Sequence, residues 1–345
     1  MRQGDFYDIR RRNLSVEYPE PQTSEVWEDP GRHLGIHEKY RHPEGDFLKD
    51  GFAPPMLEMT DHTVIEHEGR YHIFATAQTP GAWAVWEGQH HYIFHASTAD
   101  FIDYEMHPVV LYNHPDHPYE SRHCWPPFVF RYEDTFVMIY CGMDADDCQC
   151  LCMAFSDDLT EWQRYGGNPI ITPGHLDWTF KRPDGKSRHC RDPHVQRVDE
   201  WYLLYYTAFC ADGYSGVGLA ASKDLVRWED LGPCFKRDAS SWLAESPLVI
   251  ERKGKYYLLP SATPGIQCFE SDDPTDFHHK RQLEVINHGI TAPEVIDTRF
   301  EDRYLIGYHG DEGKRYTVGI MHWEGDRVRI ERITEPEQLE PWGLV

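Results

Sequence analysis

The sequence lacks an apolar run long enough to cross a bilayer, and its N-terminus lacks the apolar core of a secretory signal peptide. These two absences predict a cytoplasmic protein, with a secreted form that has lost its signal as the alternative. Positive charge is also scarce, because 34 Lys and Arg stand against 58 Asp and Glu, a formal net charge of −24. A chain this acidic repels phosphate backbones and anionic membranes, so we expect neither nucleic acid nor a membrane as a partner.

Cysteine pairs at the spacing of a zinc motif are missing as well. Four of the nine cysteines, Cys141, Cys148, Cys150 and Cys152, lie close together, which is the pattern that could indicate zinc. However, none of them forms a Cys-x-x-Cys pair, and Cys150 and Cys152 are two apart, as residues on one face of a strand are. We therefore predict buried free thiols in a reducing compartment.

What the sequence does contain is a short phrase that recurs five times. Each copy is followed by a polar turn and then by an aromatic, apolar run. Such repeats of short strands are typical of a radial β architecture. The five copies lie at residues 60–65, 125–130, 191–196, 245–250 and 291–296, and the runs lie at residues 71–74, 136–140, 201–206, 256–259 and 304–308.

The spacing of the copies predicts the fold. The intervals between equivalent positions are 65, 66, 54 and 46 residues, which four short strands and their loops would fill. We predict an all-β fold, a five-bladed β-propeller with four-stranded blades around a central channel, over residues 51–345. Residues 1–50, rich in charge, His and Pro, are predicted to be an N-terminal extension that wraps the propeller, reaches a partner or stays partly loose. The equivalent positions are His62, Pro127, Pro193, Pro247 and Pro293.

A second motif, in which Ser and Asp precede an aromatic residue, recurs at residues 97–101, 156–162, 222–228 and 271–277. Ser and Asp side chains bond to nearby backbone groups and so favour turns. We interpret these segments as turns between outer strands, not as catalytic sites.

Aligning the copies of the repeat brings three acidic residues to the same position or to the one next to it. Asp61 and Asp192 occupy equivalent positions, and Glu245 lies one residue earlier in its own copy. Hydrolysis of a glycosidic bond needs two carboxyl groups on either side of the bond, and a third can raise the proton affinity of its neighbour. Each acid alone could cap a turn, pair with an arginine or lie solvated in a loop. Their coincidence favours catalysis, so the candidate catalytic residues are Asp61, Asp192 and Glu245.

From about residue 56 to residue 320, the chain resembles glycoside hydrolase family 43 and its relatives, the five-bladed propeller superfamily of arabinanases, xylosidases, invertases and levansucrases. The resemblance rests on Asp61 and on the sequences Arg-Asp-Pro at 191–193 and Glu-Ser-Pro at 245–247. It implies that Asp61 is the general base of an inverting mechanism, that Asp192 raises the pKa of the acid, and that Glu245 is the general acid. It implies no required cofactor, and an oligosaccharide as substrate.

Departures from the family patterns bear on the choice of chemistry. His62 follows Asp61 where Pro is usual, and Ser246 stands where Gly is common in family 43 and Cys in family 32. The Trp-Met-Asn-Asp-Pro-Asn opening of family 32 is absent. We therefore expect an inverting enzyme of the arabinofuranosidase or xylosidase kind, exo-acting because long early loops tend to close one end of a groove. The alternatives are a retaining fructosidase, with Asp61 as nucleophile, a carbohydrate phosphorylase and a sugar-binding propeller without activity.

Further residues near the expected channel mouth are candidates for substrate binding or for an ion. A Ser-Arg-His-Cys sequence occurs at 121–124 and again at 187–190, each time just before an inner strand. Packing between blades, salt bridges and solvated loops are the structural alternatives. The resemblance implies a calcium or sodium ion near His309, with a core histidine as the alternative. The candidates for substrate binding are Trp125, Arg191, His194, Arg122, His123, Arg188 and Glu294.

Overall fold

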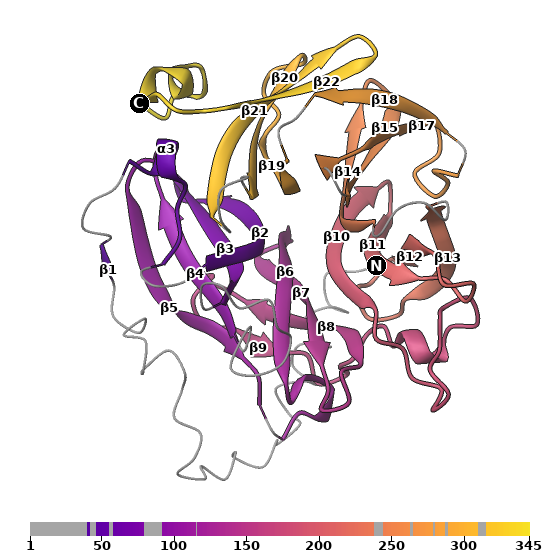
Figure 1. Cartoon of the computed structure of the whole chain (residues 1–345). Helices are drawn as coiled ribbons and strands as arrows, with labels where there is room; N and C mark the ends of the chain where they lie inside the picture. The colour runs from indigo at the N-terminus through magenta and orange to yellow at the C-terminus, as the bar shows by residue number, and fades with distance from the viewer. Residues whose placement is uncertain are drawn as a thin grey trace.

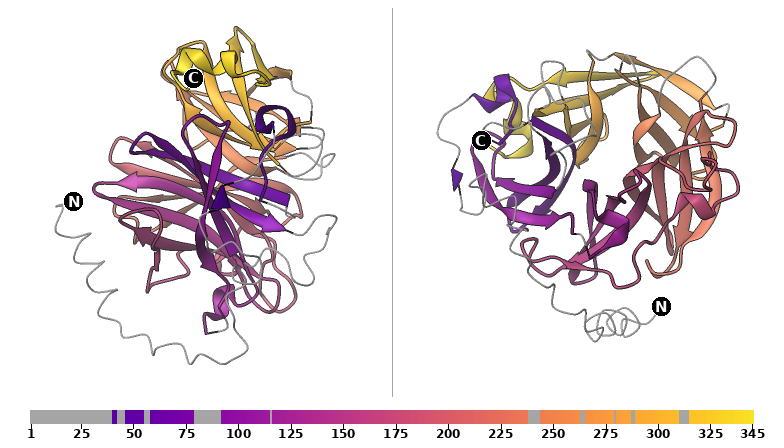
Figure 2. Two further views of the ribbon diagram at one scale, coloured as in Figure 1. Left: turned by 90° about the vertical axis from the view of Figure 1, so that its left-hand side faces the viewer. Right: turned by 60° about the horizontal axis from the view of Figure 1, so that its bottom comes forward.

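The computed structural model describes residues 40–41, 46–54, 58–78, 92–114, 116–237, 244–262, 265–278, 280–286, 289–309 and 315–345. Most of the predicted extension at residues 1–50 lies outside these ranges. In the right-hand view of Figure 2, the strands stand in a ring around one centre. None of the helices in the described ranges has the length and apolar character needed to cross a membrane.

The ring consists of five blades, each of four antiparallel strands in sequence order. Blade one holds β2 (Glu58–His67), β3 (Arg70–Gln78), β4 (Tyr92–Thr98) and β5 (Tyr104–Tyr112), and blade two holds β6 (His123–Tyr132), β7 (Thr135–Met143), β8 (Gln149–Ser156) and β9 (Gln163–Arg164). Blade three holds β10 (Cys190–Val198), β11 (Trp201–Phe209), β12 (Ser215–Ser222) and β13 (Glu229–Lys236). Blade four holds β14 (Glu245–Arg252), β15 (Lys255–Ala262), β17 (Cys268–Ser271) and β18 (Arg281–Ile286), and blade five holds β19 (Thr291–Asp297), β20 (Arg303–His309), β21 (Tyr316–Glu324) and β22 (Arg327–Arg332).

Three short additions complete the sheets, and the predicted all-β propeller is confirmed. The strand β1 (Tyr40–Arg41) pairs with β5 as a fifth strand of blade one. In blade four, β16 (Gly265–Ile266) pairs with β15. The outer strands of blades four and five, β18 and β22, pair in parallel, so these two blades form one continuous nine-stranded sheet.

The hydrophobic core lies between neighbouring blades. The strands β7 and β8 are buried at every residue, because blades one and three cover the two faces of blade two. Coverage of both faces explains why these segments appear in the sequence as unbroken apolar runs and not as an alternation. One core cluster joins Ile139 and Leu151 of blade two to Leu204 of blade three.

The first and last blades are closed by the segment at residues 46–54. It contains the helix α3 (Phe47–Asp50), and Phe52 then forms an antiparallel bridge with Tyr316 of blade five. The ring of Phe52 is stacked on that of Tyr104 in blade one, with ring centres 4.0 Å apart. The C-terminal 3-10 helix η3 (Pro336–Trp342) packs into the same core cluster, and Figure 1 shows it beside α3. This segment therefore seals the seam of the ring.

The structure confirms the predicted Ser-Asp turns and free thiols. In the turn after β8, Ser156 Oγ accepts from the Leu159 amide at 2.9 Å, and Asp158 Oδ1 accepts from the Thr160 amide at 2.8 Å. All nine cysteines are free, and all except Cys148 are buried.

Candidate active site

A bulge at the start of every inner strand creates the candidate site. The pairing register shifts at Thr60/His62, Trp125/Pro127, Arg191/His194, Glu245/Leu248 and Thr291/Glu294. At four of the five bulges a residue other than glycine has a positive φ: 21° at Asp61, 52° at Asp192, 46° at Ser246 and 46° at Ala292. Bulges redirect side chains, and backbone strain of this kind is concentrated at functional sites. The structure thus places the two aspartates and Ser246 at equivalent, strained positions.

Ser246 connects the two aspartates. Its hydroxyl donates to Asp61 Oδ1 at 2.7 Å, and its backbone amide donates to Asp192 Oδ2 at 3.1 Å. Thr207 on β11 also donates to Asp192 Oδ2, at 2.7 Å. Residues from blades one, three and four therefore meet at one point, as the repeat predicted.

Arg191 connects the third acid to this group. Its guanidinium donates to Glu245 Oε1 and lies 3.6 Å from Asp192 Oδ2. Gln149 and His189 contact the same guanidinium, each at 3.3 Å. The side chain of Glu245 is 34% exposed and that of Asp192 only 6% exposed. Glu245 can therefore meet a ligand directly, whereas Asp192 lies deeper in the site.

The acids influence one another electrostatically. Burial and, to a smaller degree, the nearby carboxylates of Asp61 and Glu245 raise the pKa of Asp192 to about 7, while Arg191 opposes the shift. Burial also raises the pKa of Glu294 well above its ordinary value, again with a contribution from Asp61. Neighbouring carboxyl groups with perturbed pKa values are typical of catalytic sites.

His194, two residues after Asp192, contacts both neighbouring blades. His194 is buried, packs edge-on against Phe128 and contacts the carbonyl of Val249 at 3.1 Å. Burial lowers the pKa of His194 to about 4, so its ring is neutral and donates to that carbonyl. His194 therefore belongs to the floor of the site, and its contact with substrate remains a prediction, as does that of Glu294.

The other predicted substrate residues lie at or just before the start of the inner strands of blades two and three. Trp125 occupies the position of blade two that Glu245 occupies in blade four, and it lies beside His123, with ring centres 5.7 Å apart. Arg122 and Arg188 both pair with Asp147, Arg188 at 3.7 Å. The two repeated Arg-His sequences are thus tied together by one carboxylate, as the salt-bridge alternative predicted.

The surroundings of His309 do not suit the predicted ion. Its Nε2 lies 3.5 Å from Nδ1 of His62, and the ring of His62 lies edge-on to that of Tyr316. Calcium and similar hard cations bind oxygen ligands, whereas His309 contacts another imidazole, that of His62. A channel ion at His309 is therefore not supported.

Three residues of the site were not among the candidates predicted from the sequence. Ser246 was noted only as a departure from family patterns, and Thr207 and Gln149 carried no motif. The signal for Ser246 was its alignment with Asp61 and Asp192, which placed it at the same bulge. Thr207 and Gln149 lie at the ends of β11 and β8, and only the pairing of strands brings them to the acids.

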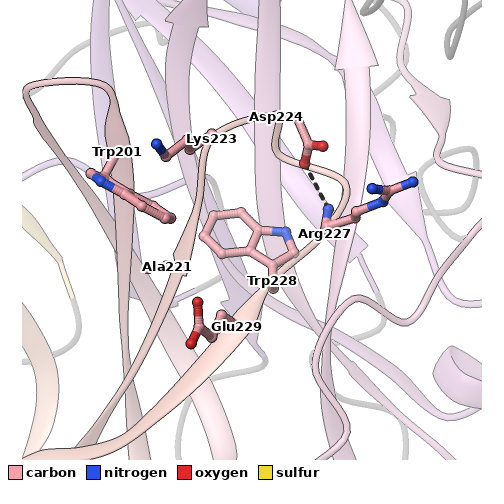
Figure 3. A pocket seen from close by; sticks show the side chains of 7 residues that line it. All are labelled: Trp201, Ala221, Lys223, Asp224, Arg227, Trp228 and Glu229. Atoms are coloured by element: carbon pink, nitrogen blue, oxygen red, sulfur yellow. Dashed lines mark hydrogen bonds between the residues drawn. The ribbon is translucent and has the colours of Figure 1, made fainter. Parts of the chain in front are cut away.

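A cavity of about 270 Å³ lies elsewhere, at the outer end of blade three. Trp201 begins β11, whereas Thr207 lies near the other end of that strand, so the cavity is remote from the acids. The ammonium group of Lys223 lies 4.3 Å from the centre of the Trp201 ring. Figure 3 shows the residues that line this cavity, which are Trp201, Ala221, Lys223, Asp224, Arg227, Trp228 and Glu229.

Known proteins resemble this chain in sequence. A sucrose-6-phosphate hydrolase of Vibrio alginolyticus is 25% identical over 252 residues, which are 65% of this chain and 48% of that protein. A second, of Klebsiella pneumoniae, is 26% identical over 79% of this chain and 57% of its own length. The chain therefore spans about half the length of the curated relatives that it matches.

Solved structures share the fold at low identity. A GH32 β-fructofuranosidase of Bombyx mori superimposes with a TM-score of 0.64 and 17% identity, over 99% of this chain and 71% of that one. A thermostable family-43 glycoside hydrolase superimposes with a TM-score of 0.61 and 18% identity, over 85% of this chain and 96% of that one. Both families thus have this propeller, and the fold alone does not separate them.

The sequence separates the two families. Residues 52–330 match the N-terminal domain of the glycosyl hydrolases of family 32, which corrects the predicted likeness to family 43. That prediction gave weight to the missing family 32 opening and to Ser246, two local departures within a domain that matches over most of the chain. The match over residues 52–330 shows that the chain belongs to glycosyl hydrolase family 32.

Proposed function

We propose that the chain hydrolyses a fructofuranosyl bond with retention of configuration. The observation that carries the proposal is the network in which Ser246 and Arg191 connect Asp61, Asp192 and Glu245, in a chain of family 32. The retaining fructosidase, an alternative on sequence grounds, thereby replaces the inverting arabinofuranosidase as the leading chemistry.

In this mechanism two carboxyl groups act in turn. Asp61 attacks the anomeric carbon and forms a covalent glycosyl-enzyme, while Glu245 protonates the oxygen of the leaving group. Glu245 then removes a proton from water, and the water releases the sugar from Asp61. The exposure of Glu245 supports its role as the group that meets the leaving oxygen and the water.

The remaining residues position this pair. The Ser246 hydroxyl fixes the orientation of the Asp61 carboxylate before substrate arrives, which lowers the cost of reaching an attacking geometry. Asp192, with a pKa of about 7, exchanges its proton near neutral pH and can donate to or accept from a sugar hydroxyl. The positive charge of Arg191 offsets the repulsion among the three neighbouring carboxylates.

We favour a neutral fructoside such as sucrose over a phosphorylated one. Arg122 and Arg188, two of the predicted substrate-binding cations, both pair with Asp147. The net charge of −24 also opposes the approach of an anionic substrate. The named curated relatives act on sucrose 6-phosphate, so this preference is open to direct comparison.

The test is incubation of the purified chain with sucrose, sucrose 6-phosphate and 1-kestose, with arabinofuranosyl and xylosyl oligosaccharides as controls. We expect release of fructose, faster from sucrose than from its phosphate. Methanol added to the reaction should trap the retained methyl fructofuranoside, because a glycosyl-enzyme can pass its sugar to an alcohol. Release of arabinose or xylose without fructose, or absence of the methyl glycoside, would overturn the proposal.

Two variants separate hydrolysis from simple binding. We expect Glu245→Gln to lower kcat by about 10²–10⁴-fold while sucrose still binds, because Gln cannot transfer the proton. Glu251→Gln, an exposed change on the same strand, is the matched control and should keep full activity. Full turnover in Glu245→Gln would contradict the assignment of the acid, and activity that requires inorganic phosphate would indicate a phosphorylase.

A further inference from the structure

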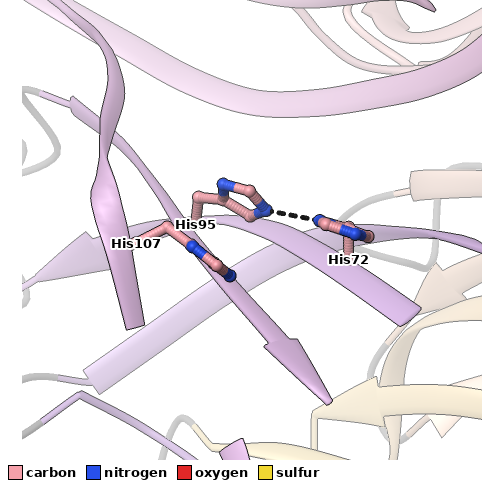
Figure 4. Close-up of side chains that lie close together, drawn as sticks. All are labelled: His72, His95 and His107. Atoms are coloured by element: carbon pink, nitrogen blue, oxygen red, sulfur yellow. Dashed lines mark hydrogen bonds between the residues drawn. The ribbon is translucent and has the colours of Figure 1, made fainter. Parts of the chain in front are cut away.

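Three histidines meet in blade one, away from the acids. His72 lies on β3, His95 on β4 and His107 on β5, which are neighbouring strands. One ring nitrogen of each residue lies within 4.8 Å of the other two. Figure 4 shows the three side chains close together, with the hydrogen bond between His72 and His95. Within the part of the chain that the structure describes, this is the one set of three residues that could hold a metal ion.

Packing of the propeller does not require histidine at these places. The pairing registers make Val137 and Met153 of blade two equivalent to His72 and His95, and the same positions in blade three hold Leu203 and Leu219. Blade five has Leu305 and Val318 there. Blade one therefore replaces apolar side chains between blades with imidazoles, at a cost in desolvation. A ligand for those imidazoles would account for the replacement.

The hydrogen bonds of His95 leave a nitrogen lone pair unused. His95 Nε2 and His72 Nδ1 are 2.9 Å apart, and His95 Nδ1 is buried without a hydrogen-bond partner among the described residues. A buried N–H without a partner is costly. His95 therefore carries its proton on Nε2 and donates it to His72, and its Nδ1 keeps a lone pair. Imidazole rings with available lone pairs are what a metal ion requires.

His107 is oriented by a polar chain. Its Nε2 lies 2.7 Å from Ser97 Oγ, and Ser97 Oγ accepts from Arg70 at 3.1 Å and 3.0 Å. The ring of His107 is stacked on that of His95, with ring centres 4.3 Å apart, and Phe74 covers the other face of His95 at 4.3 Å. The rings are therefore held in place, and His72, partly exposed, provides access from solvent.

We propose that His72, His95 and His107 form a binding site for one divalent transition-metal ion of the zinc type. Three imidazoles without a carboxylate suit Zn²⁺, Co²⁺, Ni²⁺ or Cu²⁺ and not calcium or magnesium. A tetrahedral zinc ion with Zn–N bonds of about 2.1 Å spaces its nitrogens about 3.4 Å apart. One ring nitrogen of each histidine lies within 4.8 Å of the other two, which is close to this spacing. Small ring rotations and loss of one hydrogen bond would admit the ion, which would then tie β3, β4 and β5 together.

The experiment is titration of the full chain, without a polyhistidine tag and freed of metal by a chelator, with Co²⁺ and then Zn²⁺. We expect one equivalent of Co²⁺ to bind with visible absorption bands of a site with nitrogen ligands, and Zn²⁺ to displace it and raise Tm. His95→Leu copies the residue of blade three, and His72→Gln changes the most exposed of the three. Each should weaken binding by at least about tenfold.

His175→Gln, which removes an exposed histidine outside the group, is the control and should bind as the unchanged protein does. If His95→Leu fails to fold, His72→Gln decides the question. Absence of a saturable first equivalent, or equal affinity in His72→Gln and in the control, would overturn the proposal and leave a stacked imidazole cluster. Metal binding and Tm do not depend on hydrolysis of fructosides, so this experiment can overturn the metal site without affecting the proposed hydrolysis.

Discussion

At the scale of single residues, Ser246 does the most to connect the site. We expect Ser246→Ala to lower kcat/KM by roughly ten- to a hundredfold, because a hydrogen bond to a carboxylate contributes about 1.5–3 kcal/mol. Ser246→Cys keeps a weak donor and should lose less. Initial rates with sucrose measure both, and an unchanged rate in Ser246→Ala would show that the hydroxyl does not hold Asp61 for attack.

We expect Asp192 to lower the stability of the folded chain and to contribute to its activity. Its pKa is about 7 in the folded chain and 3.8 ordinarily, so between these values the folded state binds more protons and stability falls as pH rises. Asp192→Asn removes this titration and can still accept from Thr207 and Ser246. We expect its gain in Tm over the unchanged protein to be larger at about pH 8 than at about pH 5. Its kcat should fall by on the order of a hundredfold.

Thermal unfolding at both pH values measures the first effect, and turnover of sucrose measures the second. An equal gain in Tm at the two pH values would contradict the raised pKa. Full turnover in Asp192→Asn would exclude a role for its charge or its proton in the reaction.

His194 should give the opposite dependence on pH. Its pKa is about 4 in the folded chain and 6.5 ordinarily, so the unfolded chain binds more protons between these values. The stability it contributes is complete above about pH 6.5 and is lost as pH falls toward about 4. We expect His194→Phe to reduce this loss on the acid side, as measured by urea unfolding across that range. An unchanged acid slope would show that other groups govern it.

At the scale of the element, the repeated Ser-Asp turn holds the outer strands. Asp158 Oδ1 accepts from two backbone amides, those of Thr160 and Glu161, at 2.8 Å and 2.9 Å. We expect Asp158→Ala to lower the free energy of unfolding by about 1–2 kcal/mol, as loss of a cap does. Glu161→Ala, which changes only an exposed side chain of the same turn, should be nearly neutral. Chemical denaturation of both variants checks this, and equal losses would contradict it.

The strands and their starting residues could be predicted from the sequence, whereas contacts that depend on strand pairing could not. Five copies of one phrase predicted five inner strands, and the alignment of Asp61 with Asp192 predicted their meeting, because a repeat places equivalent positions at one radius. Thr207 and Gln149 could not be predicted, since their approach depends on the register between strands. The group of His72, His95 and His107 was hidden for the same reason. Its members are far apart in sequence and become neighbours only through pairing across β3, β4 and β5.

At the scale of the whole molecule, closure of the ring rests on residues 46–54. Phe52 is fully buried between the first and last blades. We expect Phe52→Ala to lower the free energy of unfolding by about 3–5 kcal/mol, the usual cost of removing a buried phenylalanine. Phe180→Ala is the control, because the side chain of Phe180 is 42% exposed. A small loss at Phe52, measured by chemical denaturation, would mean that the ring closes without this residue.

The parallel pairing of β18 with β22 has a consequence for how the ring can come apart. By hydrogen bonding, the described residues form four sheets, although the repeat gives five blades. Blades four and five share a backbone ladder and should open, exchange and refold as one body. The other joints between blades are held by side-chain packing and by scattered hydrogen bonds, such as the one from the Phe277 amide to the Cys234 carbonyl. Fragments cut between β13 and β14 should therefore reassociate more readily than fragments cut between β18 and β19. At the C-terminal end, the unit that could be inserted, lost or transferred intact is then the pair of blades four and five. Elsewhere it is a single blade.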